Sequence, residues 1–331
     1  MRPIKKIVQL TVGFLITFAV VMTLPALSEQ SLAAKLPPQR TFASPEDARQ
    51  ALVSAVESKD QQQLAPLFGP VLDEMKPGDP VEEATEFQRF AGHVAEGVEL
   101  KMEGDNKAIL EIGEKKWPFP IPIVKKGESW VYDTEAGREE ILNRRIGRNE
   151  VSAINVCRTY VQAQHEYYDM MVADGDPVPK YAQHMISRPG KKNGLYWPTV
   201  AGQEESPLGP LVAKAKEEGY MTPRKDGERG PRPFHGYYFK ILKKQEKSAP
   251  GGKYDYIING NMVAGHALVA YPSRWGVSGV MTFIVNQSGR VYEKNLGADT
   301  GKIAKKMKAY NPDQSWKLVQ PMIQLEKPES H

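Results

Sequence analysis

The stretch T134-EAGREEILNRRIGRNEVSAINVCRTYVQAQHEYYDM-M171 decides the fold, because it reads as one long amphipathic helix. Asp133 precedes it and can accept a hydrogen bond from the first free amides of the helix. From Glu150 onward, mainly apolar residues recur at alternating steps of four and three, which places them on one face. They are Ala153, Cys157, Tyr160, Gln164, Tyr167 and Met171. Such a helix is stable when its apolar stripe is packed, so we expect a sheet to cover the stripe and Gly147 to mark a bend or restart.

The residues before this helix, 35–133, are predicted to form a small α+β domain. Helices come first, and the earliest begins at Ser44-Pro45. A hairpin then joins residues 98–102 to 108–112. The proline-bearing stretch Trp117–Val124 is expected to be an edge or covering strand, because proline cannot donate to a ladder. A strand over 127–133 completes the sheet, and this order resembles the cone-like domains of the nuclear transport factor two type.

The residues after the helix, 173–325, are predicted to form a second α+β domain, followed by a tail at 326–331. A short helix is expected over 211–218. Strand patterns at 236–242, 254–258, 266–271, 280–285 and 290–294 indicate an antiparallel meander. The fold class is therefore α+β, with a connecting helix at 134–172 and the meander packed on that helix.

The helix also resembles the body of the N-terminal helix of type IV pilins and pseudopilins. The matching positions are Glu150, Ala153-Ile154, Arg158, Ala163-Gln164 and Tyr167. This resemblance implies a pilin-like pairing of the helix with the C-terminal meander. A pilin helix begins inside the membrane, whereas this one follows a complete domain, so filament assembly is not implied.

Several longer blocks of sequence carry a more specific resemblance. Among them are W117-PFPIPIVK, C157-RTYVQAQHEY, F234-HGYYFKIL and W275-GVSGVMTFIVNQSGRVYEKNLG. They resemble the bacterial domain-of-unknown-function 2950 family over nearly the whole chain after residue 34. The resemblance implies a secreted or envelope protein and assigns no activity.

The first 34 residues have the organisation of a secretory signal peptide. Arg2, Lys5 and Lys6 precede an apolar run over 7–24, and Ser31-Leu-Ala33 or Leu32-Ala-Ala34 offers a small-residue cleavage site. We expect an exported protein in the periplasm or outside the cell. An uncleaved segment would instead anchor it to the inner membrane, and only then would it have a membrane contact.

Charge and cysteine content narrow the function further. The chain has 44 Lys and Arg against 40 Asp and Glu, a net charge of +4, and the basic residues are scattered in pairs along the sequence. This argues against a nucleic-acid partner, which requires a basic footprint. The one cysteine, Cys157, lies on the apolar stripe and is predicted to be a buried, unreactive thiol.

The sequence has no motif for a cofactor. It lacks HExxH, GxxxxGK and GxGxxG, and Gly276-Val-Ser-Gly-Val280 lacks the last glycine of a nucleophile elbow. We predict no cofactor. Asp174 and Asp176, with Asp169 in reach, are candidates for calcium, and a solvated turn is favoured because three carboxylates are needed.

Three functional hypotheses follow. The first is a non-catalytic envelope protein that binds a partner protein or surface polymer through aromatic loop residues, since aromatics with polar tips suit such sites. The predicted contact residues are Tyr196, Trp197, His235, Tyr237, Tyr271 and Trp275. The second is a periplasmic hydrolase using His235 with Asp255 or His266 as acid and base. The third is a carrier with an apolar pocket lined by Trp117, Phe119 and Trp130.

Overall fold

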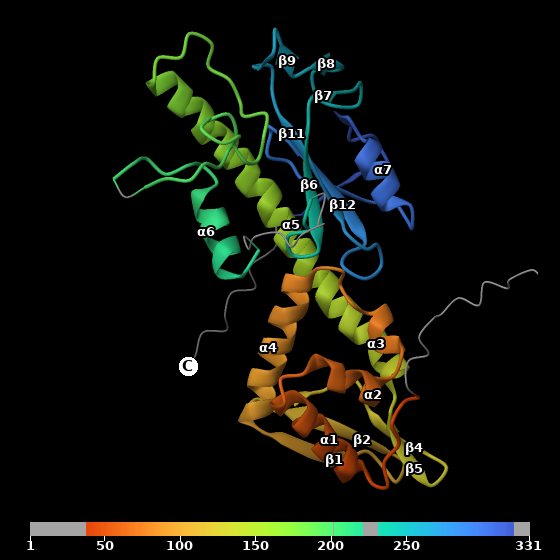
Figure 1. Ribbon diagram of the computed structural model, residues 1–331. Helices are drawn as coiled ribbons and strands as arrows, with labels where there is room; N and C mark the ends of the chain where they lie inside the picture. The colour runs from red at the N-terminus through yellow and green to blue at the C-terminus, as the bar shows by residue number, and fades with distance from the viewer. Residues whose placement is uncertain (1–37, 201, 221–230, 321–331) are drawn as a thin grey trace, which may run out of the picture. The chain divides into compact units, whose positions relative to one another are not determined.

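The structure is a computed structural model that describes residues 38–200, 202–220 and 231–320. Helices and mainly antiparallel strands occur in separate runs along the chain, so the predicted α+β class is confirmed (Figure 1). The predicted signal peptide and tail lie outside the described residues. Within the described ranges, no helix combines the length and the apolar character that a membrane span requires.

The first part packs helices against a small sheet. The helices are α1 (Pro45–Glu57), the 3-10 turn η1 (Gln61–Gln63), α2 (Leu64–Phe68), α3 (Val71–Glu74) and α4 (Pro80–Glu96). The strands are β1 (Val98–Met102), β2 (Lys107–Ile112), β3 (Trp117–Pro118), β4 (Ile123–Lys126) and β5 (Ser129–Tyr132), in the order β1-β2-β4-β5, with β3 also on β2. The predicted hairpin is present and pairs Val98 with Ile112. Its core is apolar and includes Leu52, Leu110 and Tyr132.

Two details of this part differ from expectation. The proline-bearing stretch Trp117–Val124 is not one edge strand. Its first two residues form β3, which pairs with β2, and its last two begin β4, which lies between β2 and β5. The passage from Pro70 to Pro80 has the polar residues, glycine and prolines that favour a surface loop, yet Met75 and Asp79 are buried. Arg145 explains part of this burial, since its guanidinium donates to the Met75 carbonyl.

The long helix α5 runs without interruption over Thr134–Ala173, and Asp133 caps its start by accepting from the Ala136 amide at 3.4 Å. The expected break at Gly147 is wrong. Gly147 is exposed within the helix, and an added Cβ would meet nothing within 4 Å. The helix continues through Gly147 because side chains before and after this glycine are held by tertiary contacts. Arg145 pairs with Glu86 at 2.8 Å, and Glu150 accepts from the backbone amides of Val280 and Met281 at 2.9 Å.

The second part is a five-stranded antiparallel sheet between two helical layers. Its strands are β6 (Tyr237–Leu242), β11 (Ala267–Pro272), β12 (Met281–Asn286), β13 (Tyr292–Asn295) and β15 (Lys317–Leu318), in the order β15-β13-β12-β11-β6. Successive side chains of a strand face opposite ways. Leu268 and Ala270 pack on the α5 stripe, whereas Ala267 and Val269 belong to the cluster containing Ala304 of α7 (Thr300–Lys306). Figure 1 shows α5 and α7 on opposite faces of this sheet.

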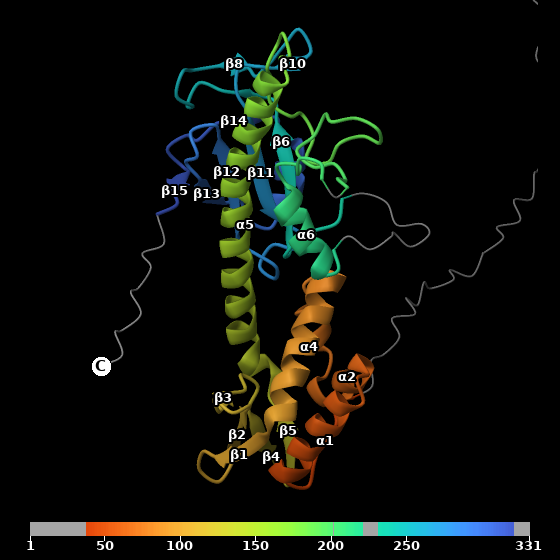
Figure 2. The same cartoon turned by 90° about the vertical axis from the view of Figure 1, so that its left-hand side faces the viewer.

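Shorter elements complete the second part. They are α6 (Gly209–Glu217), β7 (Lys244–Gln245), β8 (Tyr254–Asp255), β9 (Ile257–Ile258), β10 (Asn261–Met262) and β14 (Ala309–Tyr310). β14, β7 and β8 form a small sheet, and β9 pairs with β10. Figure 2 shows α6 alongside α5. Helix α7 was not predicted from the sequence. Cys157 is buried, as expected, and burial raises the pKa of its thiol to about 12.

Candidate functional site

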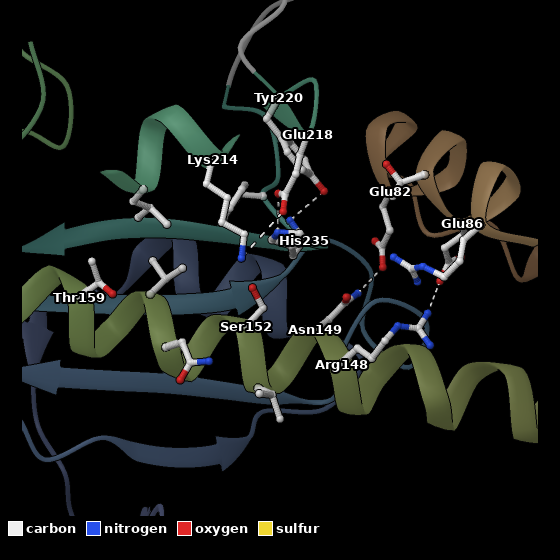
Figure 3. A pocket seen from close by; sticks show the side chains of 17 residues that line it. Glu82, Glu86, Arg148, Asn149, Ser152, Thr159, Lys214, Glu218, Tyr220 and His235 are labelled. Carbon is white, nitrogen blue, oxygen red and sulfur yellow. Dashed lines mark hydrogen bonds and ion pairs between the residues drawn. The ribbon is translucent and has the colours of Figure 1, made fainter. Parts of the chain in front are cut away.

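A polar cavity of 460 Å³ lies where α4, α5, α6 and the loop at His235 meet (Figure 3). We call it the His235 cavity. Helix α4 contributes Glu82 and Glu86, and α6 with its C-terminal turn contributes Lys214 and Glu218. The lining from α5 is Arg148, Asn149, Val151, Ser152, Asn155, Val156 and Thr159. Pockets for apolar small molecules are mostly hydrophobic, so this charged and amide-rich lining indicates a hydrophilic ligand.

Asp79 holds the loop to the start of α4. Its Oδ1 caps the helix by accepting from the amides of Val81 and Glu82, at 3.1 and 3.2 Å. Its Oδ2 accepts from the Tyr220 hydroxyl and from the Gly236 amide, both at 3.2 Å. Asp79 is only 1% exposed. Because one buried carboxylate satisfies donors from three segments, it fixes the positions of the helix and the loop together.

His235 occupies a conformation that side chains rarely adopt. Its φ is +46°, and the next residue, Gly236, is also left-handed at +71°. The His235 amide donates to the Tyr220 hydroxyl at 3.1 Å, and His235 Nε2 lies 2.9 Å from Glu218 Oε2. Burial lowers the pKa of His235 although Glu218 opposes the shift, so the ring is neutral at pH 7. Glu218 Oε2 is buried and has no hydrogen-bond partner anywhere in the described ranges, so this close contact is not a formed hydrogen bond.

Glu82 is the most perturbed carboxyl of the cavity. Burial is the largest cause and raises the pKa of Glu82 to about 7, while a hydrogen bond from Asn149 acts in the opposite direction. Oε1 accepts that hydrogen bond at 2.7 Å. Oε2 is buried and has no hydrogen-bond partner in the described part of the chain. A buried oxygen without a partner at the edge of a cavity is a natural contact for a ligand.

The polar face of α5 forms the floor of the cavity. Ser152, Asn155 and Thr159 follow one another at steps of three and four residues, so they project from one side of the helix. None of their side chains forms a hydrogen bond within residues 38–200, 202–220 and 231–320. A second polar groove of 290 Å³ shares Thr159 and Leu211 with the cavity and continues along α5 to Gln162 and Glu166. The floor therefore extends beyond a single compact pocket.

The fold and the site define an α+β protein with one long helix that serves both as core and as the floor of a polar cavity. The chain belongs to the family described as Protein of unknown function (DUF2950), which it matches over residues 39–319. No curated protein and no solved structure matches the chain.

The three residues predicted for acid–base catalysis do not converge. His235 lines the cavity, but Asp255 is an exposed residue of β8. His266 is fully buried against Tyr160 and Tyr181, with ring centroids 5.3 and 4.7 Å away. Burial lowers the pKa of His266 to about 3, so the ring is neutral and belongs to the core. The group beside His235 is Glu218.

The predicted aromatic contact residues do not form one exposed surface. Trp197, Tyr237 and Tyr271 are at most 5% exposed, because their rings pack in the cores on the two faces of the second sheet. Tyr196 is half-buried, and Trp275 is 40% exposed on a separate turn. His235 is the one member that lines the cavity. Aromatic residues beside glycine and proline were interpreted as a binding surface, but in the structure most of them pack in the core at the ends of loops.

The acidic turn at 173–177 has its own ionic partner. Asp176 pairs with Lys180 at 2.8 Å and accepts from the Val178 amide at 2.9 Å. Asp174 caps the end of α5 through its backbone, and Asp169 is exposed. In the ranges the structure covers, no three or more His, Cys, Asp or Glu side chains are grouped to hold a metal ion.

The expected apolar pocket of the first part is filled by its own rings. Phe119 stacks on Phe90 at 5.4 Å and lies 6.0 Å from Phe68. Trp130 is buried in the same core. Trp117 is exposed and has the Arg144 guanidinium over its ring at 4.7 Å. These side chains stabilise the sheet, and the carrier hypothesis stays a prediction.

Sequence reasoning missed most of the cavity. Glu82, Asn149, Glu218 and Tyr220 come from stretches far apart in the chain, and each alone reads as a solvated helix or loop residue. One local signal was available. Asp79-Pro80 has the form of a helix start, and such a cap fixes where α4 begins.

Proposed function

We propose that this chain is an exported, non-catalytic binding protein that holds a segment of a hydroxyl-bearing surface polymer in the His235 cavity and the adjoining groove on α5. Export is inferred from the N-terminal signal pattern. The single observation that carries the proposal is the polar floor, where Ser152, Asn155 and Thr159 face a cavity without hydrogen-bond partners among the described residues.

The chemistry of the lining favours a glycan-like ligand. Side-chain hydroxyls and amides donate and accept, as sugar hydroxyls do, and each bond of this kind is worth about 1 kcal/mol. Charged groups at the ends of the cavity already lie beside opposite charges, Glu86 beside Arg148 and Glu218 within 4.0 Å of Lys214. Such paired ends suit a neutral, hydrophilic chain better than a strongly charged one.

The length of the floor favours a polymer over a monomer. From Ser152 to Glu166 the helix advances by 14 residues, which is about 21 Å at 1.5 Å per residue. One sugar ring cannot reach all five polar side chains of this row. A chain of several units can contact Ser152 and Glu166 at once.

The test is affinity electrophoresis of the full chain in gels containing extracted surface glycans. Asn155→Ala combined with Thr159→Val removes two floor contacts, and we expect retardation to weaken by about tenfold or more, since two lost hydrogen bonds cost roughly 2 kcal/mol. Asn143→Ala is the matched control, because Asn143 is an exposed asparagine of the same helix outside both cavities. Equal retardation of the double variant and the control would refute the proposal.

A second candidate function rests on Glu82 and His235. A carboxyl with a pKa near 7 can donate a proton, and a neutral imidazole 2.9 Å from Glu218 can accept one, so the same cavity has the parts for acid–base hydrolysis. We propose this hydrolase as the alternative, with Glu82 and Glu218 in place of Asp255 and His266.

The two functions separate in one assay. Incubation with the retarding glycan should leave its chain length unchanged if the protein only binds. Progressive shortening that is lost in Glu82→Gln, while retardation is retained, would establish the hydrolase instead.

A further inference from the structure

A second cavity, on the opposite side of the large sheet from α5, gathers lysines from two distant stretches of the chain. It has a volume of 460 Å³, and five lysines line it: Lys240, Lys243, Lys244, Lys305 and Lys308. We call it the lysine pocket. One wall of the pocket is formed by residues of β6, β7, β8 and β9. The other wall is the C-terminal end of α7, the helix that covers this face (Figure 1).

The charge of the pocket is unbalanced. Asp255 is the one acidic residue of its lining, so five lysines leave an excess of four positive charges. The whole chain of 331 residues also has a net charge of +4. The positive charge is therefore concentrated at this pocket and not spread evenly along the chain. Lys243, Lys305 and Lys308 are exposed and form no ion pair within the residues that the structure describes.

Two of the lysines are held in place. Lys240 donates to the carbonyls of Ala304 and Lys305 at 2.6 and 2.8 Å, which caps the end of α7. Lys244 lies 3.7 Å from Glu246. These contacts fix the two walls, while the three unpaired ammonium groups remain available at the rim.

The floor of the pocket is apolar. Ile241, Ile257 and Met307 line it, together with the methylene stems of the lysines. A free inorganic anion would contact the rim and gain nothing from this floor. An anionic group attached to an apolar body would use both.

We infer that the lysine pocket is a binding site for an anionic phospholipid, whose phosphate contacts Lys243, Lys305 and Lys308 and whose first acyl carbons cover Ile241, Ile257 and Met307. Lysine is a frequent phosphate ligand, and basic pockets bind lipid headgroups on the same principle. The site is separate from the His235 cavity, so this inference stands or falls independently of the proposed function.

The test is titration calorimetry of the full chain with monomeric dihexanoyl phosphatidylglycerol. The soluble short-chain lipid avoids bilayers, into which the apolar run at 7–24 would insert. We expect phosphatidylglycerol to bind at least about tenfold tighter than dihexanoyl phosphatidylcholine, which has no net charge. Glycerol phosphate, which carries at least the negative charge of the lipid but no acyl chain, should bind at least about tenfold more weakly than the lipid.

The variant combines Lys243→Gln, Lys305→Gln and Lys308→Gln. Each lysine contributes roughly a fivefold effect, so we expect affinity for phosphatidylglycerol to fall by about a hundredfold. The control combines Lys115→Gln, Lys125→Gln and Lys126→Gln, three exposed lysines of the first part that form no ion pair in the described chain. It changes net charge equally and should bind as the wild type does.

Three results would overturn the inference. Equal affinities of the two triple variants would show that general charge, and not the pocket, attracts the lipid. Equal binding of glycerol phosphate and phosphatidylglycerol would show a phosphate site without lipid character. Absence of binding by the wild type would remove the site altogether.

Discussion

The side-chain amide of Asn149 on α5 donates to the Glu82 carboxyl on α4 at 2.7 Å, and the same nitrogen lies 3.1 Å from the Ser278 carbonyl. One buried amide therefore connects the helix of the first part, the central helix and the turn before β12. Glu82 is held in a site where its charged form is poorly solvated. The contact that assembles the cavity also determines the chemistry of its main carboxyl.

Glu82→Gln should change how stability depends on pH. The pKa of Glu82 is raised from 4.5 to about 7, so the folded state binds the proton more tightly than the unfolded state. The stabilisation that this tighter proton binding gives the folded state is complete below pH 4.5. It is lost as pH rises through about 7, which lowers the free energy of unfolding by about 3 kcal/mol. Urea unfolding of the wild type and the variant across this range measures it. Glu139→Gln, at an exposed position of α5, is the control. Parallel curves for wild type and Glu82→Gln would contradict the prediction.

Gly236→Ala should destabilise the protein strongly. Gly236 has a φ of +71°, and an added Cβ would lie 2.6 Å from Asn149 Nδ2 and 2.9 Å from Ser278 Cβ. Backbone strain and the clash together should cost about 2–4 kcal/mol in free energy of unfolding. Gly252→Ala is a matched control, since its φ is +75° and its surroundings are open, so it should cost only about 1 kcal/mol. A loss at Gly236 no larger than at Gly252 would mean that the turn is loosely packed.

His266→Phe should make the protein more resistant to acid. Burial lowers the pKa of His266 from 6.5 to about 3, and nearby His165 adds to the effect. A depressed histidine pKa favours the folded state above pH 6.5, and that contribution, about 5 kcal/mol, disappears as pH falls towards 3. Neither ring nitrogen has a hydrogen-bond partner in the described structure, so phenylalanine loses no bond. Acid titration followed by near-ultraviolet circular dichroism, with His93→Gln as the exposed control, gives the unfolding midpoints. An unchanged midpoint for His266→Phe would count against the assignment.

Trp197→Ala and Trp275→Ala should have different effects. Trp197 is 5% exposed and packs edge-on against Tyr167 at 6.3 Å, so its truncation should cost about 3–5 kcal/mol. Trp275 is 40% exposed, and its indole donates to Asn295 at 2.9 Å, so its truncation should cost about 1 kcal/mol or less. Thermal unfolding of both variants measures the difference. Similar losses would show that the two tryptophans share one environment.

The central helix, the first hairpin and most strands of the second sheet were predictable, because each has a local signal. The period of the apolar stripe defined α5, and the Asp133 cap marked its start. The break expected at Gly147 was wrong, since glycine lowers helix propensity only slightly when Arg145 and Glu150 are held by tertiary contacts. The pilin-like resemblance of the helix remains a prediction.

The candidate sites were hidden for a physical reason. His235 could be singled out because of its aromatic neighbours, but Glu218, Glu82 and Asn149 become a site only when three helices converge. The lysines at 240–244 and 305–308 read as scattered pairs in the sequence and form one pocket in the structure.

The sequence by itself determined the class of fold, the long helix and the alternation of buried positions in the strands, because backbone periodicity and burial are encoded over a few neighbouring residues. Only the tertiary structure decided which polar groups lose water together. The pKa of Glu82 and the charge excess of the lysine pocket depend on distances between residues far apart in the chain, and those distances exist only once the helices and sheets have packed.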